Sequence, residues 1–319
     1  MRRRAFLRTT LAAALPLATW PRGPGSRVKL IERWSWAMGQ PVHLLLFHES
    51  EAAGFEAAQA AFAELRRVES RLSRFDDASD LSELNRRAGR GPMRGDTDLL
   101  AVLRASARHR AASGGAFDVA VEPLMRVWGF RDSREGVPGP TEIREARQAV
   151  RAAVIRVDGD RIELPAAHTQ LDFGGIGVGY GLDRAGTVLR GRGVSSALLD
   201  VSGDILAIGT PPGRPAWPVD IADPRVPGGR VASTLLRDQA LATSANTVSV
   251  VRLGQMLCGH VMDPDLGRPA ERLLQATVTA RKGLAADALS TAVLVAGRAF
   301  PGVERSWMVG RPSADRGEK

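Results

Sequence analysis

Residues 171–187 read LDFGGIGVGYGLDRAGT, and no other stretch says more about the molecule. A strand-like run breaks into five closely spaced glycines before a predicted amphipathic helix. Glycine lets a backbone approach a phosphate or a metal with no Cβ in the way, and the first turn of a helix offers unpaired N–H groups to an anion. The stretch therefore predicts a ligand-binding turn, although a connection that only permits close packing fits the same residues.

The spacing of these glycines excludes the two common nucleotide-binding loops. A dinucleotide-binding turn needs glycines at positions n, n+2 and n+5. Tyr180 stands at the third of these positions after Gly175 and Gly177, and Leu182 stands there after Gly177 and Gly179. The chain also lacks GxxxxGK followed by Ser or Thr, so it has no P-loop.

The rest of the chain predicts an α+β fold with mixed, largely antiparallel sheets packed against helices. Apolar residues recur at helical spacing from Phe55 to Leu72, after a predicted strand over 42–47. Asp96 or Thr97 caps a predicted helix over 98–112. Asp158-Gly159 fits the primed turn of a hairpin. Further segments are predicted as a helix over 141–152, hairpin strands over 154–157 and 161–164, and strands over 197–199, 205–208, 219–221 and 274–279.

A second candidate feature lies in the predicted helical segment GLAADALSTA, residues 283–292. Asp287 and Thr291 are four residues apart, so they share one helical face among small, apolar neighbours. Buried aspartate is unusual unless something pairs with it, and hard oxygen ligands at this separation suit Mg2+. The alternative is that Asp287 caps a helix and that Thr291 hydrogen-bonds to a backbone carbonyl.

A third feature is LCGHVMDPDLGRP, residues 257–269, a strand-like run that carries His260 and ends in an Asp-Pro turn. A histidine that leaves a strand at a loop is well placed to exchange protons near neutral pH. Single histidines are more often structural, however. The other four histidines of the chain stand in no comparable setting.

The order of these segments resembles that of the FAD:protein FMN transferases, the ApbE-type flavin transferases. The glycine turn is similar to the family's DLGGIAKGYAVD, with Gly177 in place of the usual Ala and Val178 in place of a frequent Lys. The other matching segments are AMGQ (37–40), RLSRFD (71–76), DLSELN (80–85), GAFDVAVEPL (115–124), WGF (128–130), DVSGD (200–204), LATS (241–244), HVMDPDLGRP (260–269) and ADALSTA (286–292). The resemblance implies a T-fold-like, two-lobed single unit over residues 26–319.

The resemblance also implies a reaction. Such enzymes cleave the pyrophosphate of FAD and move the FMN half onto a Thr or Ser hydroxyl of an acceptor protein, releasing AMP, with Mg2+ at the phosphates. Phosphoryl transfer asks mainly for positioning and charge neutralisation. By resemblance, the backbone carbonyl of Gly177 and the side chains of Asp287 and Thr291 hold the metal, Mg2+ or Mn2+. His260 is the candidate base for the attacking hydroxyl, or a group that orients the phosphate.

Six further residues fall at or near family positions that contact FAD. The expected apolar or stacking contacts are Met38, Phe75, Tyr180 and Met262, and the expected hydrogen-bonding groups are Asp118 and Ser244. Large apolar residues such as Met38 and Phe75 are equally typical of a hydrophobic core. A carboxylate in a Gly-Ala-Phe-Asp turn, by contrast, has little packing value, which favours a binding role for Asp118.

The first 25 residues predict export. The segment RRAFLR (3–8) precedes an apolar run to about Trp20, as in a twin-arginine signal. The run is shorter than the roughly 20 apolar residues that span a bilayer, and no other stretch is long and apolar enough to do so. We therefore expect a periplasmic protein whose acceptor is a flavoprotein of an exported or membrane redox complex. The alternative is a cytosolic protein with a basic N-terminus.

Charge and cysteine content narrow the class of protein further. The net charge is +9, but residues 1–25 carry five arginines and no acid, so about +4 remains for the rest of the chain. Basic residues are not interleaved with aromatic ones, so nucleic-acid binding is not expected. The single cysteine, Cys258, permits no internal disulfide.

Two functions remain open from the sequence. The first is a flavin transferase that modifies an exported or membrane protein. The second is an exported FAD-binding protein or FAD pyrophosphatase that keeps the cleft and the metal without transferring FMN. The fate of the FMN half of FAD separates the two.

Overall fold

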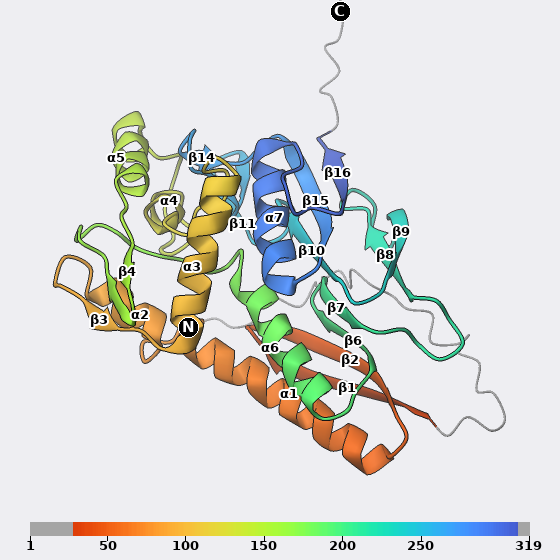
Figure 1. Ribbon diagram of the computed structural model, residues 1–319. Helices are drawn as coiled ribbons and strands as arrows, with labels where there is room; N and C mark the ends of the chain where they lie inside the picture. The colour runs from red at the N-terminus through yellow and green to blue at the C-terminus, as the bar shows by residue number, and fades with distance from the viewer. Residues whose placement is uncertain (1–27, 312–319) are drawn as a thin grey trace, which may run out of the picture.

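The computed structural model describes residues 28–311, so the export signal expected over residues 1–25 lies outside them. One seven-stranded sheet runs through the molecule in the order β1-β2-β6-β7-β10-β15-β16, and all its neighbouring strands are antiparallel (Figure 1). The α+β prediction is thereby confirmed. The strands are β1 (Lys29–Ala37), β2 (Gln40–His48), β6 (Ser196–Val201), β7 (Asp204–Ile208), β10 (Ala240–Ala245), β15 (Leu273–Ala280) and β16 (Arg305–Gly310).

Helices cover one face of this sheet. The helix α1 (Glu51–Leu72) packs along α6 (Gly177–Gly191), α6 packs along α7 (Gly283–Ala296), and α7 lies on β10 and β15. Apolar side chains from these helices, from α3 (Thr97–Ala112) and from one face of the strands form the largest buried core. Because side chains alternate across a strand, every second residue of β10 faces this helical layer.

The opposite face of the sheet is covered by a hairpin of β8 (Trp217–Ala222) and β9 (Arg230–Leu236). Trp217 is fully buried there and packs with Leu45 and Phe47 of β2 in a second core. The sheet is therefore enclosed between helices and a β-hairpin, and polar groups in its middle strands are shielded from water.

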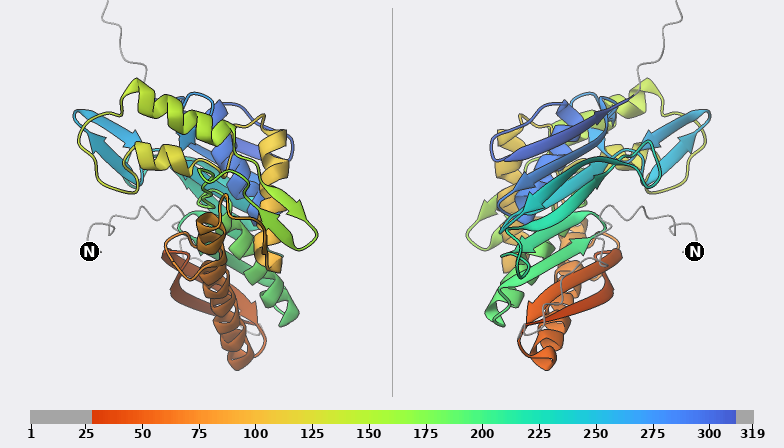
Figure 2. Two further views of the ribbon diagram at one scale, coloured as in Figure 1. Left: turned by 90° about the vertical axis from the view of Figure 1, so that its left-hand side faces the viewer. Right: turned by 90° about the vertical axis from the view of Figure 1, so that its right-hand side faces the viewer.

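A third, smaller core lies at the end of the molecule away from α1 (Figure 2). It joins two short helices, α4 (Glu122–Val127) and α5 (Pro140–Arg151), to the hairpin of β11 (Val250–Leu253) and β12 (Met256–Gly259). The remaining elements are α2 (Asp80–Arg86), β3 (Met93–Arg94), β4 (Arg156–Asp158), β5 (Arg161–Glu163), β13 (Met262–Asp263) and β14 (Arg268–Pro269).

Two local predictions differ from the structure. In the β4–β5 hairpin Asp158 pairs with Arg161, so the loop residues are Gly159 and Asp160, one position later than expected. Gly159 has a φ of 58° at the first loop position, which fits a type II′ turn. Before the glycines, residues 171–173 form no strand. The side chain of Asn85 binds both backbone groups of Leu171, at 2.8 and 2.9 Å, in place of a neighbouring strand.

Among residues 28–311, no helix combines the length and the apolar character that crossing a bilayer requires.

Candidate functional site

The glycine turn meets α7 where α6 begins. The amide of Gly179 donates to Oδ2 of Asp287 at 2.9 Å. A Cβ added to Gly179 would lie 2.2 Å from the carbonyl oxygen of Gly283, and one added to Gly283 would lie 2.4 Å from that of Gly179. Only glycine at both positions lets the two backbones approach this closely. The turn and the distant Asp287 segment are thus in direct contact.

Asp287 is a buried carboxylate that forms no ion pair with a basic side chain among residues 28–311. It is 5% exposed, and burial raises its pKa well above the ordinary value, with the charge of Asp204 raising it further. Hydrogen bonds from the backbone N–H groups of Gly179 and Val178 lower the pKa of Asp287. Within the described part of the chain, no basic side chain is among the groups that shift this pKa. The carboxylate caps α6 rather than its own helix, and a bound cation would compensate its charge.

Asp204, at the start of β7, is a second acidic group beside the first. Burial raises its pKa to about 7, and the amide of Thr243 donates to its Oδ1 at 3.1 Å. Two neighbouring carboxylates repel each other when both are ionised, and a bound divalent cation offsets this repulsion. The electrostatics of this region therefore favour cation binding.

Thr291 faces the glycine turn one helical turn after Asp287. A Cβ added to Gly175 would lie 2.8 Å from Oγ1 of Thr291, whereas one added to Gly177 would find only Phe173 within 4 Å, at 3.7 Å. Gly177 is the first residue of α6, so its carbonyl belongs to the helix. Gly175 therefore lies close to Thr291, and the metal contact of the Gly177 carbonyl stays a prediction.

Ser244 lies on the helical side of β10 and contacts α7. Its Oγ is 3.1 Å from Oγ1 of Thr291 and 2.8 Å from Oγ of Ser290. Ser244, which is predicted to bind the dinucleotide, thus forms a hydrogen bond with Thr291, a predicted metal ligand.

His260 follows β12, as its position in a strand-ending segment predicted. Its Nδ1 lies 3.2 Å from the carbonyl oxygen of Val248. A carbonyl can only accept, so Nδ1 carries the proton and Nε2 keeps a free lone pair. Burial lowers the pKa of His260, while the charge of Asp172 raises it and that of Arg131 lowers it. The imidazole is neutral at pH 7 and has the form that a general base requires.

Phe75 lies on the surface and is 82% exposed. The guanidinium carbon of Arg74 is 5.0 Å from the ring centroid, and that of Arg131 is 5.8 Å away. Arg131 also forms ion pairs with Glu122 and Asp172, and Asp172 accepts from the amide of Gly174 in the glycine turn at 2.6 Å. This network connects an exposed aromatic ring, suited to stacking on a flat ligand, to the turn and to the surroundings of His260.

Met38 lies at the tip of the β1–β2 hairpin with a φ of 56°. Its amide donates to Glu69 at 2.8 Å, and its sulfur would be 3.6 Å from a Cβ placed on Gly181 of α6. Met38 is therefore held beside α6 at Gly181, two residues after Gly179, whose amide contacts Asp287.

Three other residues predicted to bind FAD are engaged in contacts within the protein. The hydroxyl of Tyr180 donates to Asp98 at 2.6 Å, and Met262 is buried in the core of α4 and α5. Asp118 accepts from Arg110 at 2.6 Å and from the amide of Ala120 at 2.9 Å. A contact of any of the three with FAD stays a prediction.

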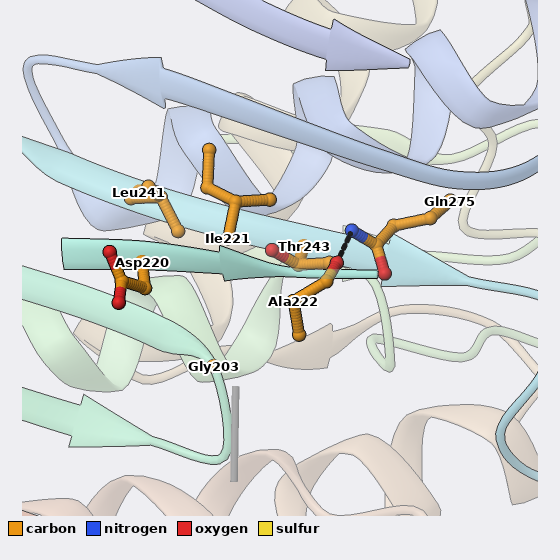
Figure 3. A pocket seen from close by; sticks show the side chains of 7 residues that line it. All are labelled: Gly203, Asp220, Ile221, Ala222, Leu241, Thr243 and Gln275. Atoms are coloured by element: carbon orange, nitrogen blue, oxygen red, sulfur yellow. Dashed lines mark hydrogen bonds between the residues drawn. The ribbon is translucent and has the colours of Figure 1, made fainter. Parts of the chain in front are cut away.

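Two hollows in the surface contain none of the residues proposed for catalysis or metal binding. Figure 3 shows the smaller one, of about 10 Å3, between β8, β10, β15 and the turn at Gly203; the Gln275 amide donates to the carbonyl of Ala222 across it. That space is about the size of one water molecule, far below the several hundred Å3 of a ligand pocket. The larger, of about 400 Å3, lies beside Arg281 and Lys282 before α7. The candidate site is therefore located by the contacts between the glycine turn, α7 and β10, and not by either hollow.

Sequence reasoning missed several residues of this site. Asp172 stood in the quoted stretch, and a carboxylate two residues before a glycine is typical of a side chain that binds the following backbone. Arg131 directly follows the WGF segment, but a single arginine carries no sequence signal of the carboxylates that it pairs with. Asp204 and Ser290 stood within matching segments, yet only the packing of β7, β10 and α7 reveals their neighbours.

Comparison with known proteins agrees with this architecture. The sequence model of the ApbE family matches residues 38–302. A FAD:protein FMN transferase of Treponema pallidum is 31% identical over 308 residues, which cover 88% of this chain and 85% of that protein. The apo structure of the flavinyl transferase ApbE of Pseudomonas stutzeri has a TM-score of 0.77 at 28% identity and covers 89% of this chain and 92% of its own. The ApbE protein of Thermotoga maritima also has a TM-score of 0.77, at 26% identity, with coverages of 84% and 87%.

The TM-scores and coverages show that this chain has the fold of these ApbE proteins. This chain belongs to the ApbE family.

Proposed function

We propose that this chain is an FAD:protein FMN transferase. The acceptor hydroxyl attacks the phosphorus of the FMN half of FAD, a new P–O bond forms, the pyrophosphate P–O bond breaks, and AMP leaves. The contact of the glycine turn with Asp287 and Thr291 is the observation that carries this proposal, because it joins a phosphate-compatible backbone to hard oxygen ligands. Relatives that bear this name match most of the chain.

Mg2+ fits the oxygen groups of the site. The proposed ligands are Asp287, Thr291 and a main-chain oxygen of the glycine turn, at Gly177 or at Gly175, where an added Cβ would lie 2.8 Å from Oγ1 of Thr291. Among residues 28–311, no group of three or more His, Cys, Asp or Glu side chains gathers as a metal site. Mg2+ commonly binds one or two carboxylates and completes its shell with water and phosphate oxygens. When bound, it would neutralise charge on the phosphates.

The chain supplies the remaining chemistry through its own side chains. His260, with its Nδ1 proton held by Val248, accepts the proton of the acceptor hydroxyl at Nε2. Phe75 offers a stacking surface for one of the flat rings of FAD. The proton of the hydroxyl thus has a destination, and the dinucleotide has an anchor outside the phosphate site.

The compartment and the acceptor are part of the same proposal. The twin-arginine-type segment at residues 3–8 supports export to the periplasm, and an exported or membrane redox protein would then be the acceptor. A reporter enzyme fused behind residues 1–25 should reach the periplasm only through the twin-arginine pathway. Retention of the reporter in the cytosol would refute export.

The transfer itself is tested with the purified protein, FAD, Mg2+ and a peptide that bears a Ser or Thr flavinylation sequence. We expect a covalently flavinylated peptide and one AMP for each flavin transferred, measured by mass spectrometry and chromatography. Free FMN with AMP would indicate a pyrophosphatase instead, and unchanged FAD would indicate a binding protein. Asp287→Ala is the matched control and should yield neither product.

A further inference from the structure

Three hydroxyl groups form a continuous chain at the proposed metal site. Oγ of Ser290 lies 2.9 Å from the carbonyl oxygen of Asp287, Oγ of Ser244 lies 2.8 Å from Oγ of Ser290, and Oγ1 of Thr291 lies 3.1 Å from Oγ of Ser244. Ser290 is 1% exposed, so its hydroxyl has no access to bulk water. Each hydroxyl has one proton to donate, and the directions of these bonds can therefore be worked out.

The chain begins at a group that can only accept. Because the Asp287 carbonyl has no proton, Ser290 donates its own to that carbonyl. Ser290 has no further proton, so in its bond with Ser244 it accepts, and Ser244 donates its single hydroxyl proton. Ser244 in turn accepts from Thr291. The O–H of Thr291 consequently points toward β10, and its lone pairs remain free on the side where Gly175 lies.

We propose that Ser290 and Ser244 are positioning residues that fix the hydroxyl of Thr291 with its lone pairs toward the divalent cation. The inference rests on the proposed metal site at Asp287 and Thr291. A metal accepts electron pairs from a neutral hydroxyl, and a hydroxyl whose proton pointed at the metal would repel it. The two serines therefore act on metal affinity without touching the metal.

Because of the order of these hydrogen bonds, substitution of Ser290 alone and further substitution of Ser244 should change metal affinity in opposite directions. In Ser290→Ala the proton of Ser244 loses its acceptor and turns toward Oγ1 of Thr291, where it competes with the metal for a lone pair. Removing Ser244 as well abolishes that competition and leaves the Thr291 hydroxyl free to rotate. The second substitution should thus restore affinity that the first one lost, which a purely structural role for both serines would not produce.

The test is a Mn2+ titration of the full-length protein, followed by electron paramagnetic resonance, which detects free Mn2+ and requires no catalysis. We expect Ser290→Ala to raise the Kd for Mn2+ about tenfold, the order expected for one misdirected buried hydrogen bond. The double variant Ser290→Ala, Ser244→Ala should recover most of that loss. Thr277→Val is the matched control, because it deletes a fully buried hydroxyl on the other face of the sheet, bonded only to Thr243.

A Kd for Ser290→Ala equal to that of the wild type would overturn the proposal. A double variant that binds more weakly than Ser290→Ala would overturn it too, since the losses would then simply accumulate. If Ser290→Ala does not fold, Ser244→Ala alone decides. Because the Thr291 hydroxyl is then free to rotate, we expect a Kd about two- to threefold above that of the wild type, and a Kd equal to the wild-type value or a loss as large as that of Asp287→Ala is the contrary result. Equal Mn2+ binding by the wild type and by Asp287→Ala would refute the metal site itself, an outcome distinct from failure of the hydroxyl chain.

Discussion

The backbones of Gly179 in α6 and Gly283 in α7 lie so close together that neither position has room for a Cβ, and Gly179→Ala tests whether this approach builds the site. The added Cβ would stand 2.2 Å from the carbonyl oxygen of Gly283 and 2.7 Å from Cβ of Asp287, whereas ordinary contact begins at 3.4 Å. The obstruction is backbone, so no side chain can rotate away. The two helices must separate by roughly 1 Å to accommodate the methyl group.

The expected cost follows from this overlap. Overpacking of a buried contact costs about 1–3 kcal/mol, and replacing a helical glycine by alanine returns up to about 1 kcal/mol. A net loss of about 1–2 kcal/mol lowers the Tm by about 2–3 °C, because the roughly 280 residues over 28–311, at about 2.1 cal/mol/K each, give a large unfolding entropy. The effect on catalysis should be larger, because a misplacement of about 1 Å between reacting groups can cost about 100-fold in rate.

Gly177→Ala is the control within the same turn. A Cβ at Gly177 would meet only Phe173, at 3.7 Å, and the position lies in the first turn of α6. We expect turnover close to that of the wild type and a Tm that is unchanged or slightly higher, since alanine lowers the entropy of the unfolded chain. Differential scanning fluorimetry gives the Tm, and AMP release from FAD with the acceptor peptide gives the rate.

The reasoning would be refuted by a Gly179→Ala variant with wild-type Tm and wild-type turnover. Equal damage from both substitutions would refute it as well, because the turn would then need glycine for flexibility rather than for the approach of α7.

The other predictions concern the base, the acidic pair and the stacking surface. His260→Ala should slow transfer about 100-fold or more while leaving the Kd for FAD nearly unchanged, and equal single-turnover rates would reject His260 as the base. The pKa of Asp204 is raised to about 7, so the folded state binds this proton more tightly than the unfolded state does. The resulting contribution to the free energy of unfolding is complete below the ordinary pKa of 3.8 and is lost as the pH rises to about 7. Asp204→Asn should therefore flatten the fall in unfolding free energy between about pH 4 and 7 in metal-free urea titrations, and an unchanged slope would contradict this. Phe75→Ala should raise the KM for FAD several-fold at unchanged Tm, and an unaltered KM would remove the ring from the binding surface.

The sequence predicted the larger elements because their signals are local. Apolar spacing located α1, and a side-chain cap at Asp96 located the start of α3, where Oδ1 of Asp96 accepts from the amide of Leu99 at 2.8 Å. The ordered family segments predicted that the glycine turn and the Asp287 segment belong to one site. The two segments are in direct contact, through the Gly179 amide and the Asp287 carboxylate, and their shared role in binding stays a prediction.

Details of the site depend on rotation and on distant partners, which the sequence does not display. Successive helical residues are rotated by about 100°, so when Gly179 faces α7 its neighbour Tyr180 points elsewhere, to Asp98 of α3. Met262 lies in a two-residue strand whose burial depends on α4 and α5, more than 100 residues earlier. The roles of these two residues could not be read from position alone.

The central claim is that the glycine turn, Asp287 and Thr291 hold one divalent cation at the phosphates of FAD. Anomalous diffraction from a crystal grown with Mn2+ and FAD tests it most directly. The account predicts a single strong peak within about 2.0–2.4 Å of an Asp287 carboxylate oxygen and Oγ1 of Thr291, next to the main chain of residues 175–177. A peak bound elsewhere, with Asp287 and Thr291 making no contact to it, would contradict the account.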